Sequence, residues 1–279
     1  MTESKSCKKE EFKKAFLRVI SVISLLLALA VALVAAEFPF GFAVAEGSSM
    51  SYICIEADGG KVLDESNADA RKYPASTTKI LTSLVVLENV PSDMKFRVPD
   101  CAVGVEGSSI YLKRGEVVKV GDLLYGLMLR SGNDAAVALA VATAGTVERF
   151  AAMMNERARR AGARNSHFVN PHGLHDNDHY TTARDLALIT AEAYRNEDFR
   201  RIVSTSSITV GEGENTRVLY NKNKLLSQVE GANGVKTGYT TKSGKCLVGG
   251  AVKDGVQRIS VVLGATCDMW QLSKRLLTA

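Results

Sequence analysis

The hydrophobic pattern of this 279-residue chain changes period twice, and this order constrains the fold more than any other feature. Residues 51–56 and 61–64 alternate like two short strands around Asp58-Gly59-Gly60, a sequence typical of a hairpin turn. From residue 76 to about 203 the apolar residues recur at helical spacing, and from 204 the period returns to two. Strands on both sides of a helical block pack most simply as one antiparallel sheet with the helices beside it.

The last third of the chain supplies most of the expected strands. The alternating segments are residues 204–210, 217–220, 234–239, 245–252 and 258–265. Lys253-Asp254-Gly255 joins the last two as a hairpin, and a closing helix begins at Met269. We therefore expect an α+β domain, with a sheet part at about 46–75 and 204–279 and a helical part at about 76–203.

The first 45 residues have the composition of an export signal. Six Lys and Arg residues precede an uncharged apolar run over residues 19–36, and Ala43-Val44-Ala45 fits a small-residue cleavage site before Glu46. The run is close to the ~18 residues at which a helix spans a bilayer, so an uncleaved membrane anchor is the alternative. Both alternatives predict an exported domain over residues 46–279, because the basic flank stays inside.

Charge excludes one class of partner. The net charge is +5, but no Lys/Arg cluster is interleaved with aromatic residues, so we expect no nucleic acid.

The cysteines and histidines offer no strong metal pattern. Cys54, Cys101, Cys246 and Cys267 are scattered like neither a compact disulfide framework nor a zinc site, and free thiols and one disulfide both remain open. A polar loop carries His172, His175 and His179. Hydrophilic turn residues explain such a loop, so we expect neither a metal nor a cofactor.

Ser76-Thr77-Thr78-Lys79 carries the first chemical signal. Residues three apart on a helix share a face, so the Lys79 amine can reach the Ser76 hydroxyl. A serine is a weak nucleophile until a neighbouring base takes its proton. Alone the pattern is common, and on a surface helix such a pair would be solvated and inert.

Two further motifs strengthen that signal. Ser131-Gly132-Asn133 interrupts an apolar helical run, which is either a simple helix–helix turn or a turn that brings a hydroxyl and an amide into a cleft. Lys236-Thr237-Gly238 lies in an expected strand, where a glycine often marks the close approach of a ligand. A lysine facing such a cleft can bind a carboxylate.

Taken together and in this order, the three motifs resemble those of the penicillin-recognising serine acyl-transferases. The wider similarity over residues 50–277 is to the low-molecular-weight D-alanyl-D-alanine carboxypeptidases, peptidase family S11. It rests on residues 73–79, 106–109, 123–136, 170–174, 181–186 and 234–239. The resemblance implies a β-lactamase/transpeptidase-like fold, with an antiparallel sheet flanked by helices and an all-helical subdomain.

The resemblance also implies roles for the first two motifs. Ser76 would attack the carbonyl between the last two D-alanines of a peptidoglycan stem peptide and form an acyl-enzyme that water hydrolyses. Lys79 would be the base, which requires a pKa far below the ~10.4 of a free lysine. Ser131 would relay a proton to the leaving amine, and Asn133 would hold the substrate or the Lys79 side chain.

In the third motif, Lys236 and Thr237 would bind the terminal carboxylate, and Gly238 would let the substrate approach. The backbone N–H groups of Ser76 and Tyr239 would form the oxyanion hole, in which one donor is worth ~3 kcal/mol. β-Lactams, which resemble the D-Ala-D-Ala end, would acylate the same serine.

Several alternatives stay open at this stage. A class A β-lactamase carries S-D-N, whereas Gly132 stands in the middle position here. A D,D-endopeptidase and a non-enzymatic penicillin- or wall-binding module would use the same motifs. Many family members continue into a β-rich domain and an amphipathic C-terminal anchor, and we expect neither within a sequence that stops at Ala279.

Overall fold

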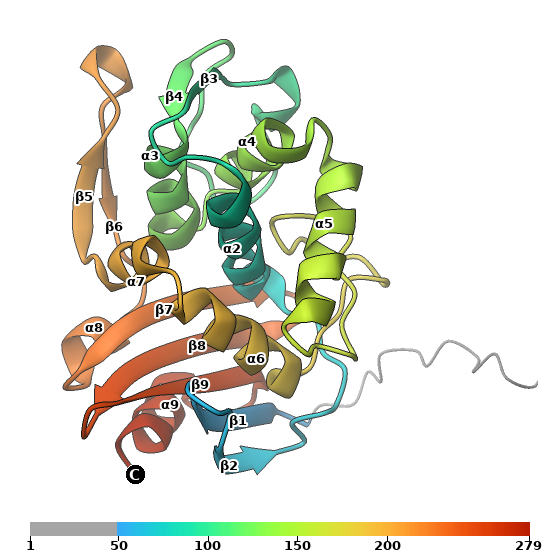
Figure 1. The fold of residues 1–279 in the computed structure, drawn as a ribbon, viewed down its shortest axis with the longest axis vertical. Coiled ribbons are helices and arrows are strands. Elements are labelled where there is room, and N and C mark those ends of the chain that lie inside the picture. The colour runs from blue at the N-terminus through green and yellow to red at the C-terminus, as the bar shows by residue number, and fades with distance from the viewer. Residues whose placement is uncertain (1–48) are drawn as a thin grey trace, which may run out of the picture. The chain divides into compact units, whose positions relative to one another are not determined.

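A computed structural model describes residues 49–279 of the chain. Five strands form one sheet in the order β2-β1-β9-β8-β7, and every neighbouring pair is antiparallel (Figure 1). Their bounds are β1 Ser51–Glu56, β2 Val62–Ser66, β7 Ala232–Thr240, β8 Gly244–Lys253 and β9 Val256–Ala265. The first strand therefore pairs with the last, as the change of period predicts. The export signal predicted for residues 1–45 lies outside the described residues.

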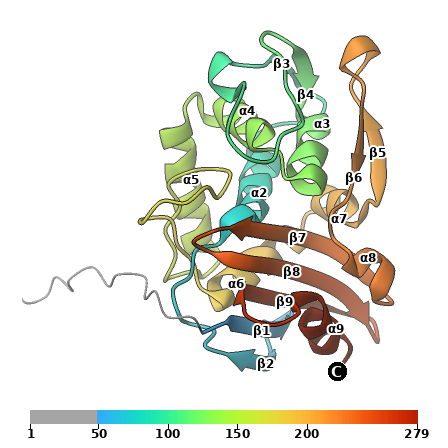
Figure 2. The ribbon, with the colours of Figure 1, turned by 180° about the vertical axis from the view of Figure 1, so that it is seen from behind.

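Helices cover both faces of this sheet. On one face lies α6 (Ala183–Tyr194), and on the other lie α8 (Leu225–Gln228) and α9 (Met269–Thr278), as comparison of Figures 1 and 2 shows. Two neighbouring glycines of β8 mark the two faces. A Cβ on Gly249 would meet Leu225 and Leu277, whereas a Cβ on Gly250 would meet the hydroxyl of Tyr194.

The remaining helices form a second layer beside the α6 face. Their bounds are α2 Lys79–Asn89, α3 Val120–Tyr125, α4 Asn133–Ala144, α5 Val147–Arg160 and α7 Glu197–Ser204. The first eight residues of α4 are all buried, so this alanine-rich helix lies inside the layer. Phe150, Phe168 and Phe199 are also fully buried, and each such side chain contributes about 1.5–3 kcal/mol to folding.

Two small hairpins stand apart from the main sheet. β3 (Lys95–Arg97) pairs with β4 (Val117–Lys119), and β5 (Ser207–Val210) pairs with β6 (Arg217–Tyr220). The strand expected from residue 204 begins only at Ser207, because α7 extends through Ser204. Asn196 caps that helix by accepting a hydrogen bond from the Phe199 N–H.

The sequence pattern predicted most helix and strand boundaries to within a few residues. Thr182 caps α6 by accepting from the N–H of Asp185. The Asp185 carboxylate, however, does not complete a capping box, because it accepts from the Asn165 N–H and the Ser166 hydroxyl. The Asp185 side chain, in the first turn of α6, is thus used for a tertiary contact.

Cys54, Cys101, Cys246 and Cys267 are all free thiols in the structure. Within residues 49–279 no single helix is long and apolar enough to cross a bilayer, and only α4 with α5, bent by 85°, passes that test as a pair.

Candidate active site

Ser76 lies in the short 3-10 helix η1 (Ala75–Thr78), which leads directly into α2. Ala75 has a φ of 49°, a left-handed backbone that only a few non-glycine residues adopt. The turn places the Ser76 Oγ 2.9 Å from the Nζ of Lys79. The contact expected from the three-residue spacing is therefore present.

Lys79 is fully buried, and its amine meets three oxygens. Besides Ser76 Oγ, Nζ lies 2.7 Å from Asn133 Oδ1 and 2.6 Å from the backbone oxygen of His172. Burial lowers the pKa of Lys79 well below its usual range, and the charges of Lys236 and Lys222 lower it further. A neutral amine in contact with a serine hydroxyl can act as a general base.

The loop that supplies the His172 oxygen was not identified as functional from the sequence. Asn170 shapes it, because its side chain accepts from the Gly173 N–H and donates to the Leu174 oxygen. A Cβ on Gly173 would lie 1.8 Å from the backbone oxygen of Ala75. The loop therefore packs directly on the turn that carries Ser76.

The histidines of this loop differ from the polar-turn interpretation. His179 is buried, and its Nδ1 accepts from the Val169 N–H, so its Nε2–H donates to the Thr78 hydroxyl. Burial lowers the pKa of His179 to about 3, which keeps the ring neutral. This ring thus supports the Ser76 turn. Among residues 49–279 no group of three His, Cys, Asp or Glu side chains is arranged to hold a metal ion.

Ser131 and Asn133 reach the site from the break before α4. A π-helical turn, Gly126–Arg130, ends at Ser131, which has a φ of 66°. Asn133 begins α4, and its Nδ2 donates to the Glu106 oxygen at 2.5 Å while its Oδ1 faces Lys79. The Ser131 hydroxyl lines the same cavity as Ser76, with no hydrogen bond to Lys79 or Lys236 among residues 49–279.

The third motif lies on β7, the edge strand of the sheet, and its alternate residues face opposite sides. A Cβ on Gly238 would lie 3.0 Å from the Ser76 nitrogen, so a larger residue would press on the nucleophile. Lys236 shares that inner face; it is 1% exposed, and its Nζ donates to the Thr237 oxygen at 2.9 Å. Burial, with help from Lys222, lowers the pKa of Lys236 to about 7.

These motifs open onto one cavity of about 440 Å³. Five predicted site residues and five others line it: Ser76, Ser108, Ser131, Lys222, Thr237, Gly238, Tyr239, Lys245, Met269 and Trp270. None of these described residues is acidic, and two of the five additional ones are lysines. Ser108 lies in the stretch over residues 106–109 that supports the family resemblance, whereas no short motif marks Lys222, Lys245, Met269 or Trp270, because only folding brings them to the cavity.

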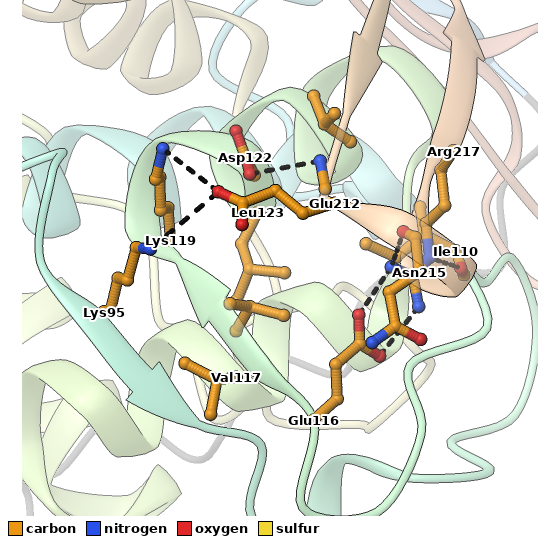
Figure 3. A pocket seen from close by; sticks show the side chains of 13 residues that line it. Lys95, Ile110, Glu116, Val117, Lys119, Asp122, Leu123, Glu212, Asn215 and Arg217 are labelled. Carbon is orange, nitrogen blue, oxygen red and sulfur yellow. Dashed lines mark hydrogen bonds and ion pairs between the residues drawn. The ribbon is translucent and has the colours of Figure 1, made fainter.

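A second cavity of about 200 Å³ lies between the β3–β4 and β5–β6 hairpins (Figure 3). Ion pairs join its walls: Arg217 to Glu116, and Lys95 and Lys119 to Glu212. It contains no residue of the three motifs, and Figure 3 shows its charges paired with one another rather than directed at a vacant centre. Residues of the three motifs therefore line the first cavity and not this one.

Comparison with known proteins agrees with the geometry. The profile of the D-alanyl-D-alanine carboxypeptidases, peptidase family S11, matches residues 39–267. The chain belongs to this family. It is 37% identical over 222 residues to D-alanyl-D-alanine carboxypeptidase DacF of Bacillus subtilis, covering 77% of this chain and 57% of the relative. It is 36% identical over 242 residues to DacA of Escherichia coli K12, covering 82% and 59%.

The solved structures of the family share this fold. The D-alanyl-D-alanine carboxypeptidase DacD of Francisella tularensis superposes with a TM-score of 0.75 at 29% identity, covering 85% of this chain and 72% of that one. A variant of the Streptomyces K15 DD-transpeptidase superposes with a TM-score of 0.74 at 35% identity, covering 85% and 96%. The predicted transpeptidase-like fold is thereby confirmed. The chain spans less than three fifths of the two curated relatives named above.

Proposed function

We propose that the chain is a serine D-alanyl-D-alanine carboxypeptidase that removes the terminal D-alanine from peptidoglycan stem peptides. The observation that carries this proposal is the 2.9 Å contact between the Ser76 hydroxyl and a fully buried Lys79 amine. The lowered pKa of Lys79 supplies a neutral base at the nucleophile. Family membership and the names of the relatives support the same substrate.

The substrate would add to the free edge of β7, as extended peptides add to exposed strands. Its terminal carboxylate would lie at Lys236 and Thr237. The scissile carbonyl would then lie between the N–H groups of Ser76 and Tyr239, which would stabilise the oxyanion. Gly238 permits this approach, because its backbone passes close to Ser76.

The reaction would proceed in two steps. Lys79 takes the Ser76 proton, the serine oxygen bonds to the carbonyl carbon, and the C–N bond breaks as the leaving D-alanine amine receives a proton through Ser131. Water then adds to the ester and releases Ser76. Asn133 keeps Lys79 in place through its Oδ1. No cofactor or metal enters either step.

This function implies partners and a compartment. The substrates are stem peptides ending in D-Ala-D-Ala, and β-lactams would form a stable ester with Ser76. The enzyme would act outside the cytoplasm, exported by the segment at residues 1–45, and would contact the membrane only through that segment if it is uncleaved. Residues 46–279 would form the catalytic domain.

Mass spectrometry and D-alanine release together test the proposal. Incubation with penicillin should add one acyl group at Ser76, and diacetyl-Lys-D-Ala-D-Ala should lose its terminal D-alanine. Ser76→Ala should abolish both results, and penicillin labelling that persists in this variant would overturn the assignment of the nucleophile. The intact mass also reports whether the chain is cut after Ala45.

Two outcomes would point to related functions. Labelling without D-alanine release would indicate a penicillin-binding module, and rapid nitrocefin turnover would indicate a β-lactamase. Because a structural relative is described as a DD-transpeptidase, an amine acceptor should also be added. A new peptide bond to that amine would show that it competes with water for the acyl-enzyme.

A further inference from the structure

We propose that Lys245 and Trp270 form a subsite for the residue that precedes D-Ala-D-Ala, and that this subsite selects a long aliphatic side chain ending in a carboxylate. The inference rests on the proposed function, because it concerns the part of the substrate that the three motifs do not bind. Both residues line the catalytic cavity, together with Tyr239 and Met269. No short motif marks Lys245 or Trp270.

The catalytic cavity continues around the edge of the sheet toward the face that α9 covers. Successive residues of a strand face opposite sides of the sheet. Gly238 faces the Ser76 turn, so Tyr239 faces the other side. Lys245 of β8 lies directly opposite Tyr239 in the register, and such cross-strand partners share a face. Lys245 is therefore placed on the α9 side of the cavity.

Trp270 is held at this end of the cavity by contacts with α8 and α9. Its backbone N–H donates to the Asp268 carboxylate at 2.9 Å, at the start of α9. The Lys224 amine lies 5.9 Å from the centre of its ring, which is a cation–π contact. With Met269, Trp270 also packs on the small hydrophobic cluster between α8, α9 and β8, yet it stays partly exposed. The ring thus offers a fixed apolar surface to an aliphatic chain.

The expected direction of the substrate brings the preceding residue to this surface. The terminal carboxylate would lie at Lys236 and Thr237, and the scissile carbonyl at the N–H of Tyr239. The peptide would therefore run antiparallel to β7, and each further residue would advance it by about 3.3 Å beyond Tyr239. The residue before D-Ala-D-Ala would thus reach the end of the cavity that Lys245 and Trp270 line.

The charges at this end of the cavity determine which group the side chain should carry at its tip. Lys245 is exposed, and no ion pair with it is found among residues 49–279. The Asp268 carboxylate is the acidic group next to the ring, but it already accepts from the N–H groups of Trp270 and Gln271. Lys224 adds a second positive charge over the ring. A carboxylate would be attracted to this place, whereas an ammonium group would be repelled.

Three peptides that differ only at the tip of one side chain test the inference. Each is Nα-acetyl-X-D-Ala-D-Ala, in which X is lysine, 2-aminopimelate or the side-chain carboxamide of 2-aminopimelate. The aliphatic chains have equal length and end in an ammonium, a carboxylate or a neutral group. Wild-type kcat/KM should be lowest for the ammonium peptide and highest for the carboxylate peptide, roughly threefold to fivefold above the carboxamide peptide. Equal kcat/KM on the ammonium and carboxylate peptides would overturn the proposal.

Reversing the charge of Lys245 gives a result that a structural defect would not produce. Lys245→Glu should invert the order, so that the ammonium peptide becomes the best of the three substrates. Lys245→Arg should keep the wild-type order. Lys274→Gln, which removes an exposed charge from α9 outside the cavity lining, is the matched control and should also keep that order. An unchanged order in Lys245→Glu would reject the role of Lys245.

Trp270 is tested by the presence of the aliphatic chain rather than by its charge. Acetyl-Gly-D-Ala-D-Ala lacks that chain, so the advantage of the carboxylate peptide over it measures the whole subsite. Trp270→Ala should reduce this advantage roughly fivefold, and Trp270→Phe should retain most of it. If Trp270→Ala lowers kcat/KM equally on both peptides, the ring has only a structural role and the subsite is rejected.

A binding measurement separates this inference from the proposed function. Trp270 is the only tryptophan of the chain and lines the cavity, so its fluorescence can report peptide binding to Ser76→Ala. The carboxylate peptide should bind roughly tenfold more tightly than the ammonium peptide. Equal affinities would reject the subsite. If this order of affinities holds but the wild-type chain releases no D-alanine from any peptide, the proposed function alone fails.

Discussion

Lys79 and Lys236 are both buried, but their amines contact different groups. The Lys79 amine meets the nucleophile and two carbonyl-type oxygens, whereas the Lys236 amine meets only the Thr237 oxygen. Burial lowers the pKa of both lysines. Lys79 is thus suited to accept a proton, and Lys236 to gain charge when a carboxylate arrives.

We therefore expect kcat/KM on a peptide acid to pass through a maximum with pH. As pH falls through the lowered pKa of Lys79, the amine is protonated and the base is lost. As pH rises through about 7, Lys236 loses its charge and carboxylate binding weakens. Steady-state rates on the acid and on its amide should share the acid limb, while the amide lacks the alkaline one. Identical profiles for both peptides would contradict these roles.

At the residue scale, the sequence predicts contacts that depend only on local spacing. The Ser76–Lys79 contact follows from a three-residue step, which is nearly the same in every helical turn. The His172 oxygen, 93 residues away, follows from no such rule. Its contact with Lys79 depends on how a loop packs on η1, and a backbone atom leaves no side-chain signature.

At the scale of elements, the loop over residues 170–174 is held against η1 by a glycine. Gly173 has a φ of 85°, and a Cβ there would overlap the backbone oxygen of Ala75. The same loop accepts a hydrogen bond from the Thr82 hydroxyl at the Pro171 oxygen. The loop and the nucleophile turn therefore form one unit.

Gly173→Ala should lower both stability and activity, because it displaces the loop from Lys79. We expect a loss of more than ~3 kcal/mol in the free energy of unfolding, measured with urea, and a fall in kcat. Gly145→Ala is the control: its φ is 80°, but no atom lies within 4 Å of the added Cβ. That variant should lose only ~1 kcal/mol and keep full activity. Equal losses of unfolding free energy in the two variants would mean that the loss in Gly173→Ala comes from backbone strain alone and not from the contact with Ala75.

Element boundaries were predictable where a short-range signal exists. The bounds of β1 and β6 match the expected strands. The π-helical turn before Ser131 and the left-handed Ser131 were not predicted, because tertiary packing of buried residues 126–129 outweighs local preference there.

At the scale of the whole molecule, a buried ion pair connects the β5–β6 hairpin to the segment that leads into β4. Both guanidinium NH groups of Arg217 reach the Glu116 carboxylate, at 2.6 and 2.8 Å, and its Nε donates to the Ile110 oxygen (Figure 3). The Glu116 side chain is only 2% exposed. Because Lys222 follows this hairpin, the ion pair also helps to place it at the cavity.

Arg217→Met should destabilise the fold by roughly 3–5 kcal/mol, because it leaves a buried carboxylate without its partner. Arg114→Met removes the exposed pair with Asp100 and should cost less than about 1 kcal/mol. Urea denaturation measures both values. A combined Arg217→Met and Glu116→Leu variant should recover part of the loss, and no recovery would show that the carbonyl contacts of Arg217 dominate.

The sequence by itself determined the strand–helix–strand order, the Ser76–Lys79 contact and the three motifs that identify the family. These depend on the period of the apolar residues, on helix caps and on the spacing of the motif residues, all of which involve only a few neighbouring residues. Only the tertiary structure showed that Lys79 and Lys236 are both buried, which backbone oxygen contacts Lys79, and that Lys222 and Trp270 line the cavity. The reason is physical: burial and long-range charge depend on every segment that packs around a group, and no local stretch of sequence contains them.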